Sequence, residues 1–194
     1  MSFKPGRNTW EGLLMSLKEH FELLSAYNQS MNSKIYETVG QLSVTELTKE
    51  RGAFFGSILA TLNHIIVGDT IWLKRFATHP FCLDALREVA GLENPASLDQ
   101  VVFKDFGSLS EHRFWLDSKI INWIAELSDS DLDFILSYRD TEGVPANKRY
   151  SSLILHFFNH QTHHRGQIST LLSQAGLDVG VTDLLAQILE EAHL

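Results

Sequence analysis

Apolar residues recur every three or four positions along four separate stretches of the 194-residue chain. This spacing matches the 3.6-residue turn of an α-helix, in which residues i, i+3, i+4 and i+7 share one face. It predicts long helices at about residues 9–41, 57–78, 108–127 and 151–175. Four long amphipathic helices can bury their apolar faces against one another, so we predict an all-α protein built as a four-helix bundle.

Residues that begin or end helices support these limits. SVTE at residues 43–46 is a capping box and predicts a short helix after the first long one. Pro80 ends the second long helix, and Ser108 or Ser110 begins the third. Gly176 suits the position just past the end of the fourth helix.

The connecting segments carry different signals. SDSDLD at 128–133 predicts a turn, and FILSYRD and NKRYSS around TEGVPA at 141–146 indicate a small β-hairpin before the fourth helix. Residues 79–107 predict a loop over one end of the bundle. VTDLLAQILEEA at 181–192 predicts a final short helix. The length fits a single domain over residues 1–194.

Composition and charge limit the partners. The net charge is −8 and no basic stripe is present, which argues against nucleic acid as a partner. No run approaches eighteen apolar residues, so we expect no membrane span. The opening MSFKPGRNTWEG does not resemble a signal peptide. Cys82 is the only cysteine, which excludes a disulfide within one chain and favours a reducing, cytoplasmic setting.

Histidines are concentrated in the fourth predicted helix, where NHQTHHRGQI at 159–168 follows His156. With His156 at zero on a helical wheel, His160 falls at about 40°, His164 at about 80° and His163 at about 340°. The apolar residues of this helix lie at about 60–120°, so His160 and His164 point inward and the other two lie at the edge of the stripe. An inward i,i+4 pair can bind one metal ion.

A third ligand must come from another helix. TLNHIIVGDTIW in the second long helix supplies its only histidine, His64, on a strongly apolar face. Three imidazoles from two facing helices would form an open metal site with water in the remaining positions. Histidines hydrogen-bonded to carbonyl or carboxylate groups in the core are the other interpretation, and the spacing alone leaves both open.

Neighbouring residues offer further candidates. Asp69 is the nearest carboxylate, either as an orienting or fourth ligand or as the partner of an arginine or lysine. Gln167 lies on the histidine side and can donate to a ligand or cap a buried carbonyl. Gly166 costs helix stability and would permit close approach of another helix or a subunit, whereas Arg165 points elsewhere and is expected to be structural. The remaining histidines are not leading ligand candidates; they are His20, His79, His112 and His193. We expect His112 to lie in solvent.

The arrangement of these motifs resembles the DinB family of DinB/YfiT-like metalloenzymes. Asn63-His64 in the second long helix and NHQTHHRGQ at 159–167 carry the resemblance, which covers most of the chain. It implies a four-helix bundle, commonly a homodimer, with a divalent metal on His64, His160 and His164. His163 then corresponds to a family histidine that is not normally a ligand. Relatives in the wider superfamily look like S-transferases and isomerases that use mycothiol, bacillithiol or glutathione.

Three functional hypotheses follow. The first is an enzyme in which zinc or nickel helps to transfer a low-molecular-weight thiol to a small electrophile, with metal-dependent hydrolysis as its nearest variant. The second is a non-catalytic metal-binding stress-response protein, and the third is a metal-free core of structural histidines. Catalytic residues stay unknown, with Asp69, His163 and Gln167 as candidates. A small-molecule substrate is the expected partner, without nucleic acid or membrane.

Overall fold

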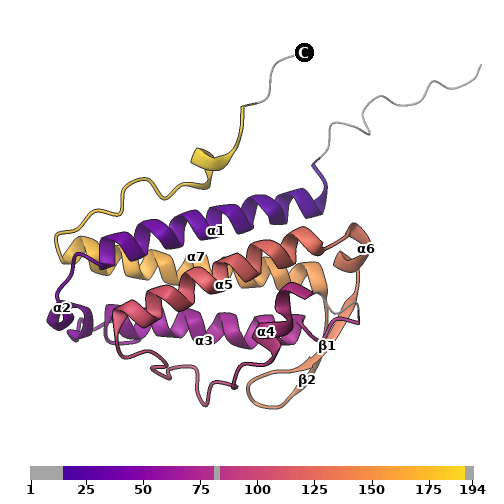
Figure 1. Ribbon diagram of the computed structural model, residues 1–194, viewed down its shortest axis with the longest axis horizontal. Helices are drawn as coiled ribbons and strands as arrows, with labels where there is room; N and C mark the ends of the chain where they lie inside the picture. Colours follow the sequence, from indigo (N-terminus) through magenta and orange to yellow (C-terminus); the bar gives the residue numbers. More distant parts are fainter. Residues whose placement is uncertain (1–14, 81–83, 191–194) are drawn as a thin grey trace, which may run out of the picture.

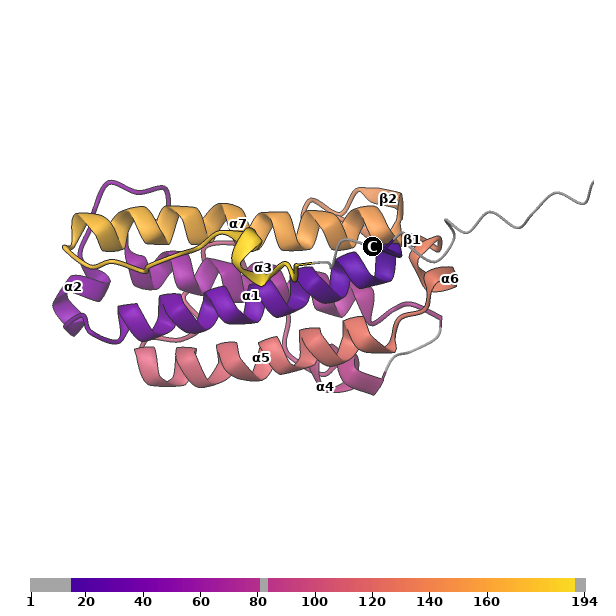
Figure 2. The ribbon, with the colours of Figure 1, turned by 90° about the horizontal axis from the view of Figure 1, so that it is seen from above.

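Four long helices form the body of the protein in a computed structural model that describes residues 15–80 and 84–190. They are α1 (Leu17–Val39), α3 (Ile58–Phe76), α5 (Phe106–Glu126) and α7 (Tyr150–Gln174). Helix α1 packs against both α5 and α7, and α3 packs against α7 (Figures 1 and 2). The predicted four-helix bundle is therefore confirmed. Within the described residues, no helix is both long and apolar enough to cross a membrane.

Short elements connect the long helices. The helical ones are α2 (Val44–Thr48), the 3₁₀ turn η1 (Asp84–Leu86), α4 (Arg87–Ala90), α6 (Asp129–Leu132) and the 3₁₀ turn η2 (Leu184–Gln187). The predicted hairpin is present as antiparallel strands β1 (Ile135–Arg139) and β2 (Pro145–Arg149), with Ile135 opposite Arg149. It lies beside the end of α3 and leads directly into α7 (Figure 1).

Side-chain caps determine where α3 and α5 begin. Ser57 begins α3 as predicted, because its hydroxyl accepts a hydrogen bond from the Ala60 amide. The predicted start of α5 at Ser108 or Ser110 is wrong, because the Asp105 carboxylate accepts from the Ser108 amide and caps the helix earlier. Aspartate and serine cap helices about equally well, so the sequence offered three adequate starting points.

Two other segments differ from the prediction. Residues 128–133 form the short helix α6 instead of a simple turn, because Ser128 and Asp131 make a capping box. The predicted final helix shortens to η2, whose Leu185 is 75% exposed and therefore gains little from packing. Gly176 ends α7 as predicted, with a φ of +82° that suits glycine. Residues 9–14 of the predicted first helix, Cys82 and His193 lie outside the described residues.

An aromatic cluster fixes α3 against its neighbours at the hairpin end of the bundle. The rings of Phe76 on α3 and Trp123 on α5 stack with their centroids 4.8 Å apart. Trp123 Nε1 donates to the hydroxyl of Tyr150 on α7, 3.1 Å away. All three side chains are fully buried, and removing such a ring typically costs about 3–5 kcal/mol. This packing holds α3 and α7 side by side, which is the arrangement that forms the site.

Candidate metal centre

The three histidines predicted as ligands meet between α3 and α7. His64 comes from α3, and His160 and His164 come from successive turns of α7. The Nε2 atom of His64 lies 3.3 Å from that of His160 and 3.1 Å from that of His164. The two α7 histidines have their Nε2 atoms 3.1 Å apart. Among the described residues this is the one group of histidine, cysteine or acidic side chains with the spacing of a metal site.

The distances suit a single ion. Three atoms separated by 3.1–3.3 Å can all lie about 2.0–2.1 Å from one point, which is the usual zinc–imidazole distance. Neutral imidazoles are accepted by zinc, nickel, copper and iron, so the donor set does not choose among them.

Hydrogen bonds at the opposite ring nitrogens direct the Nε2 lone pairs inward. Nδ1 of His64 donates to the carbonyl oxygen of Leu98 at 2.7 Å. Nδ1 of His164 donates to Oε1 of Gln167 at 2.8 Å. A neutral histidine with its proton on Nδ1 has a bare lone pair on Nε2. Lone pairs that face each other at 3.1 Å repel, and a cation between them removes that repulsion.

Burial keeps these histidines in the neutral form that binds metal. Loss of solvent lowers the pKa of His64 and of His164 below the ordinary value. Burial also lowers the pKa of His160, to about 3, and the neighbouring His164 and His64 lower it further. All three are therefore uncharged at neutral pH, as metal coordination requires.

A glycine on α3 makes room for His160. A Cβ atom at Gly68 would lie 2.8 Å from Cε1 of His160, which is closer than such atoms approach one another. The close approach of another helix of this chain to Gly166 is wrong, because a Cβ there would meet no atom of the described chain within 4 Å, and the approach of a subunit stays a prediction. The sequence feature that could have indicated this close approach is Gly68 itself, which lies one helical turn after His64 in a helix of otherwise larger residues.

Asp69 does not contact the histidines. Its carboxylate forms a fully buried ion pair with Arg113 of α5, which also pairs with Asp117. Burial raises the pKa of Asp69 to about 6, although the guanidinium opposes that shift. Of the two predicted roles for Asp69, the ion pair with an arginine is the one that the structure contains.

Gln167 contacts the ring nitrogen of His164 that faces away from the triad, and His163 lies next to Gln167. Gln167 Oε1 accepts the His164 proton, so it acts on a candidate ligand as an acceptor, not as the donor that the sequence suggested. Its Nε2 lies 3.4 Å from Nε2 of His163, which is exposed and outside the triad. Arg165 is buried and donates to Asn28 of α1, in agreement with a structural role.

Three other described histidines lie apart from the triad. The prediction that His112 lies in solvent is wrong, because its ring packs between Phe103 and Trp115, with centroids 4.9 and 5.1 Å away. His79 is buried beside Asp131. His20 lies near the start of α1, where its Nδ1 contacts the Ser16 carbonyl. None of them belongs to a group with metal-binding spacing.

Cavities open on both sides of the triad. One, of about 540 Å³, reaches His64 and His164 together with His163 and Gln167. The ring of Phe55 forms part of its wall and stacks on His64 at a centroid distance of 4.0 Å. The other, of about 250 Å³, reaches His64 and His160. Each cavity is therefore lined by two of the three candidate ligands, as expected of a site that takes a small molecule.

Comparisons with known proteins show the family of the chain and agree with its fold. The family model described as "DinB family" matches residues 15–192. Protein DinB of Bacillus subtilis (strain 168) is 26% identical over 160 residues, which cover 82% of this chain and 88% of that protein. The crystal structure of a DinB-like protein from Bacillus cereus ATCC 10987 aligns with a TM-score of 0.52 at 22% identity. The alignment covers 80% of this chain and 91% of that one. At this identity the structural likeness supports the fold alone.

Proposed function

The chain belongs to the DinB family, and from this premise and the histidine geometry we propose a metal-dependent enzyme that transfers a low-molecular-weight thiol to a small electrophile. Zinc or nickel would be held by Nε2 of His64, His160 and His164. The observation that carries the proposal is the convergence of three neutral Nε2 atoms within 3.1–3.3 Å, beside cavities open to small molecules.

The bound ion would supply positive charge that favours the thiolate form of a thiol. The surrounding residues position the ligands. The Leu98 carbonyl holds the ring proton of His64 on Nδ1, and Gln167 does the same for His164. The Nε2 atom of each ring therefore carries no proton and can bind the ion. Phe54 and Phe55 line the cavity of about 540 Å³ and give it apolar surface that suits an apolar electrophile.

The proton of the thiol needs an acceptor. His163 lines the same cavity as His164, and its Nε2 faces Gln167. We assign it the role of receiving the thiol proton and releasing it to solvent. A carbon–sulfur bond then forms while the bond to the leaving group breaks, and the leaving group departs with the electron pair. The reaction consumes no oxidant or reductant and suits the reducing, cytoplasmic setting expected from the single cysteine.

A conjugation assay tests the activity. The zinc-loaded and nickel-loaded proteins are incubated with an aryl chloride and, in turn, with glutathione, bacillithiol and mycothiol, and chloride release and thioether formation are measured. The proposal expects turnover with at least one thiol, and loss of turnover when His64 is replaced by alanine. Hydrolysis of an ester without added thiol would favour the hydrolase instead. Stoichiometric metal without any turnover would favour a non-catalytic metal-binding protein.

A further inference from the structure

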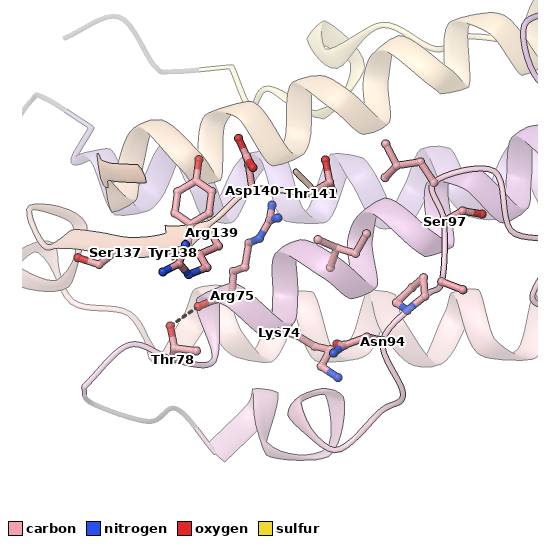
Figure 3. A pocket seen from close by; sticks show the side chains of 14 residues that line it. Lys74, Arg75, Thr78, Asn94, Ser97, Ser137, Tyr138, Arg139, Asp140 and Thr141 are labelled. Carbon is pink, nitrogen blue, oxygen red and sulfur yellow. Dashed lines mark hydrogen bonds between the residues drawn. The ribbon is translucent and has the colours of Figure 1, made fainter. Parts of the chain in front are cut away.

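Two adjoining cavities, together called the cleft, lie between the triad and the β-hairpin. A cavity of about 680 Å³ lies between α3, residues 94–98 and the hairpin (Figure 3). It adjoins the smaller cavity that reaches His64 and His160, since six residues line both. The shared residues are Ile71, Arg75, Leu98, Tyr138, Asp140 and Thr141. A ligand in this cleft can contact the triad at one end and the hairpin at the other.

The far end of the cleft is more basic than the protein as a whole. Lys74, Arg75 and Arg139 line the larger cavity, and Asp140 is the one acidic residue among the described residues that line it. The complete chain has a net charge of −8. A local excess of positive charge on an acidic protein raises the local concentration of anions.

Arg75 is the cation best placed to contact a ligand. It lines both cavities, and its guanidinium lies over the rings of Trp72 and Tyr138, at 4.7 and 4.9 Å from their centroids. These two rings hold the guanidinium in place. The side chain extends toward Asp140 and Thr141, whereas Lys74 projects toward Asn94 (Figure 3).

The other charged groups of the cleft are already engaged. Lys74 donates to the Leu92 carbonyl, and Arg139 donates to the Gly143 carbonyl at 2.7 Å. Oδ1 of Asp140 accepts the amides of Glu142 and Val144, at 2.9 and 2.8 Å. Among the described residues the Arg75 guanidinium makes no hydrogen bond or ion pair. Its planar set of N–H donors matches the two oxygens of a carboxylate or phosphate.

The spacing along α3 gives the length of the ligand. Arg75 lies seven residues after Gly68, which contacts His160, and seven residues correspond to about 10 Å along a helix axis. Eleven residues separate it from His64, a rotation of about 20° after whole turns, so both lie on the same face. A ligand with roughly 10 Å between its anionic group and its reactive group matches this axial separation.

We propose that Arg75 binds an anionic group, a carboxylate or a phosphate, at one end of a ligand whose other end reaches His64, His160 and His164. The proposal rests on the proposed function for the reactive end, because it takes that end to a metal on the triad. Arg75 then selects small molecules that carry an anionic arm and excludes neutral ones of the same length.

Matched probes test this subsite. Calorimetry of the zinc-loaded protein compares ω-mercaptooctanoate with ω-mercaptooctanol, which has the same length and no charge. The acid is expected to bind at least about tenfold more tightly, the range of one charge-assisted hydrogen-bonded pair. Arg75→Gln should abolish the difference, whereas Lys74→Gln, a change of the neighbouring cation, should retain most of it. Equal binding of acid and alcohol by the parent protein, or an unchanged preference in Arg75→Gln, overturns the proposal.

A second experiment, on the metal-free protein, tests the anionic subsite independently of metal binding. Octanoate, octyl phosphate and octanol are added to the metal-free protein, and the indole N–H signal of Trp72 is followed by NMR. Shifts caused by either anion and not by octanol, and absent in Arg75→Gln, support the anionic subsite even if zinc does not bind. The tighter of the two anions identifies carboxylate or phosphate as the preferred group. No response to either anion, together with no preference in calorimetry, contradicts the subsite.

Discussion

Gly68 of α3 and His160 of α7 lie so close that a Cβ atom at position 68 would stand 2.8 Å from Cε1 of the imidazole. No side chain fits between them, so the ring of His160 occupies the space that a larger residue would take. The position of one candidate ligand therefore depends on the absence of a side chain on the opposite helix.

Gly68→Ala should displace His160 and weaken metal binding. We expect the zinc affinity to fall about tenfold or more, because the ring must shift while the other two ligands stay in place. A competition titration against a chelating dye measures the affinity. Gly166→Ala is the matched control in α7, since a Cβ there meets nothing within 4 Å. It should leave the affinity unchanged and raise the free energy of unfolding by about 0.4–1 kcal/mol. Equal affinities in both variants would contradict the role of Gly68.

Gln167→Leu should remove the acceptor that holds the proton of His164 on Nδ1. Loss of such a hydrogen bond to a ligand typically lowers metal affinity about 10–100-fold. Gln167→Glu keeps an acceptor oxygen at the same place and should retain most of the affinity. The same dye competition checks both variants. If leucine and glutamate weaken binding equally, the hydrogen bond does not orient the ligand.

The pH dependence follows from the lowered pKa values. Protons compete with metal for Nε2, so affinity falls only where the folded histidines become protonated. Their pKa values lie below the ordinary 6.5, that of His160 at about 3. Affinity should therefore stay nearly constant from about pH 8 to 6.5 and fall at lower pH.

The stability of the metal-free protein should follow the same groups. Below pH 6.5 the unfolded chain binds protons at these histidines while the folded chain does not, so the free energy of unfolding decreases as the pH falls. Urea denaturation across this range measures the decrease. Stability that rises as the pH falls from about 6.5 to 5 would contradict the burial of neutral imidazoles.

Asp69→Ala should affect stability and not metal binding. Removing this carboxylate leaves the fully buried Arg113 with Asp117 as its remaining ion-pair partner, and breaking a buried pair typically costs about 3–5 kcal/mol. Urea denaturation measures the loss, and metal content is measured where the variant is still folded. Stoichiometric zinc is expected there. A stable variant that binds no metal would instead make Asp69 part of the metal site.

The sequence predicted the inward pair for a simple physical reason. His160 and His164 share a face with apolar residues of one helix, and helical rotation follows from residue number alone. The pairing of this face with His64 was proposed because His64 is the only histidine of the second long helix, and the family resemblance implied the same residue. The structure brings the three side chains together.

Other features of the site could not be predicted, because the nearby sequence does not indicate them. The carbonyl of Leu98, which fixes the tautomer of His64, belongs to a loop, and every residue has such a carbonyl. Phe55 reaches His64 from the segment before α3, where no periodicity indicates its direction. The final helix was predicted from apolar spacing, but Leu185 and Leu189 stay exposed, so the pattern gains little from packing and forms only a 3₁₀ turn.

The most direct test of the central claim is the metal content of untagged protein purified without chelator or nickel resin, measured by plasma mass spectrometry. The variant with His64, His160 and His164 all replaced by alanine is measured in parallel, with its fold checked by circular dichroism. The account predicts close to one zinc or nickel ion per chain in the parent and none in the folded variant. A parent that holds no metal, even after zinc or nickel is added, would contradict the metal centre and leave these histidines as core residues.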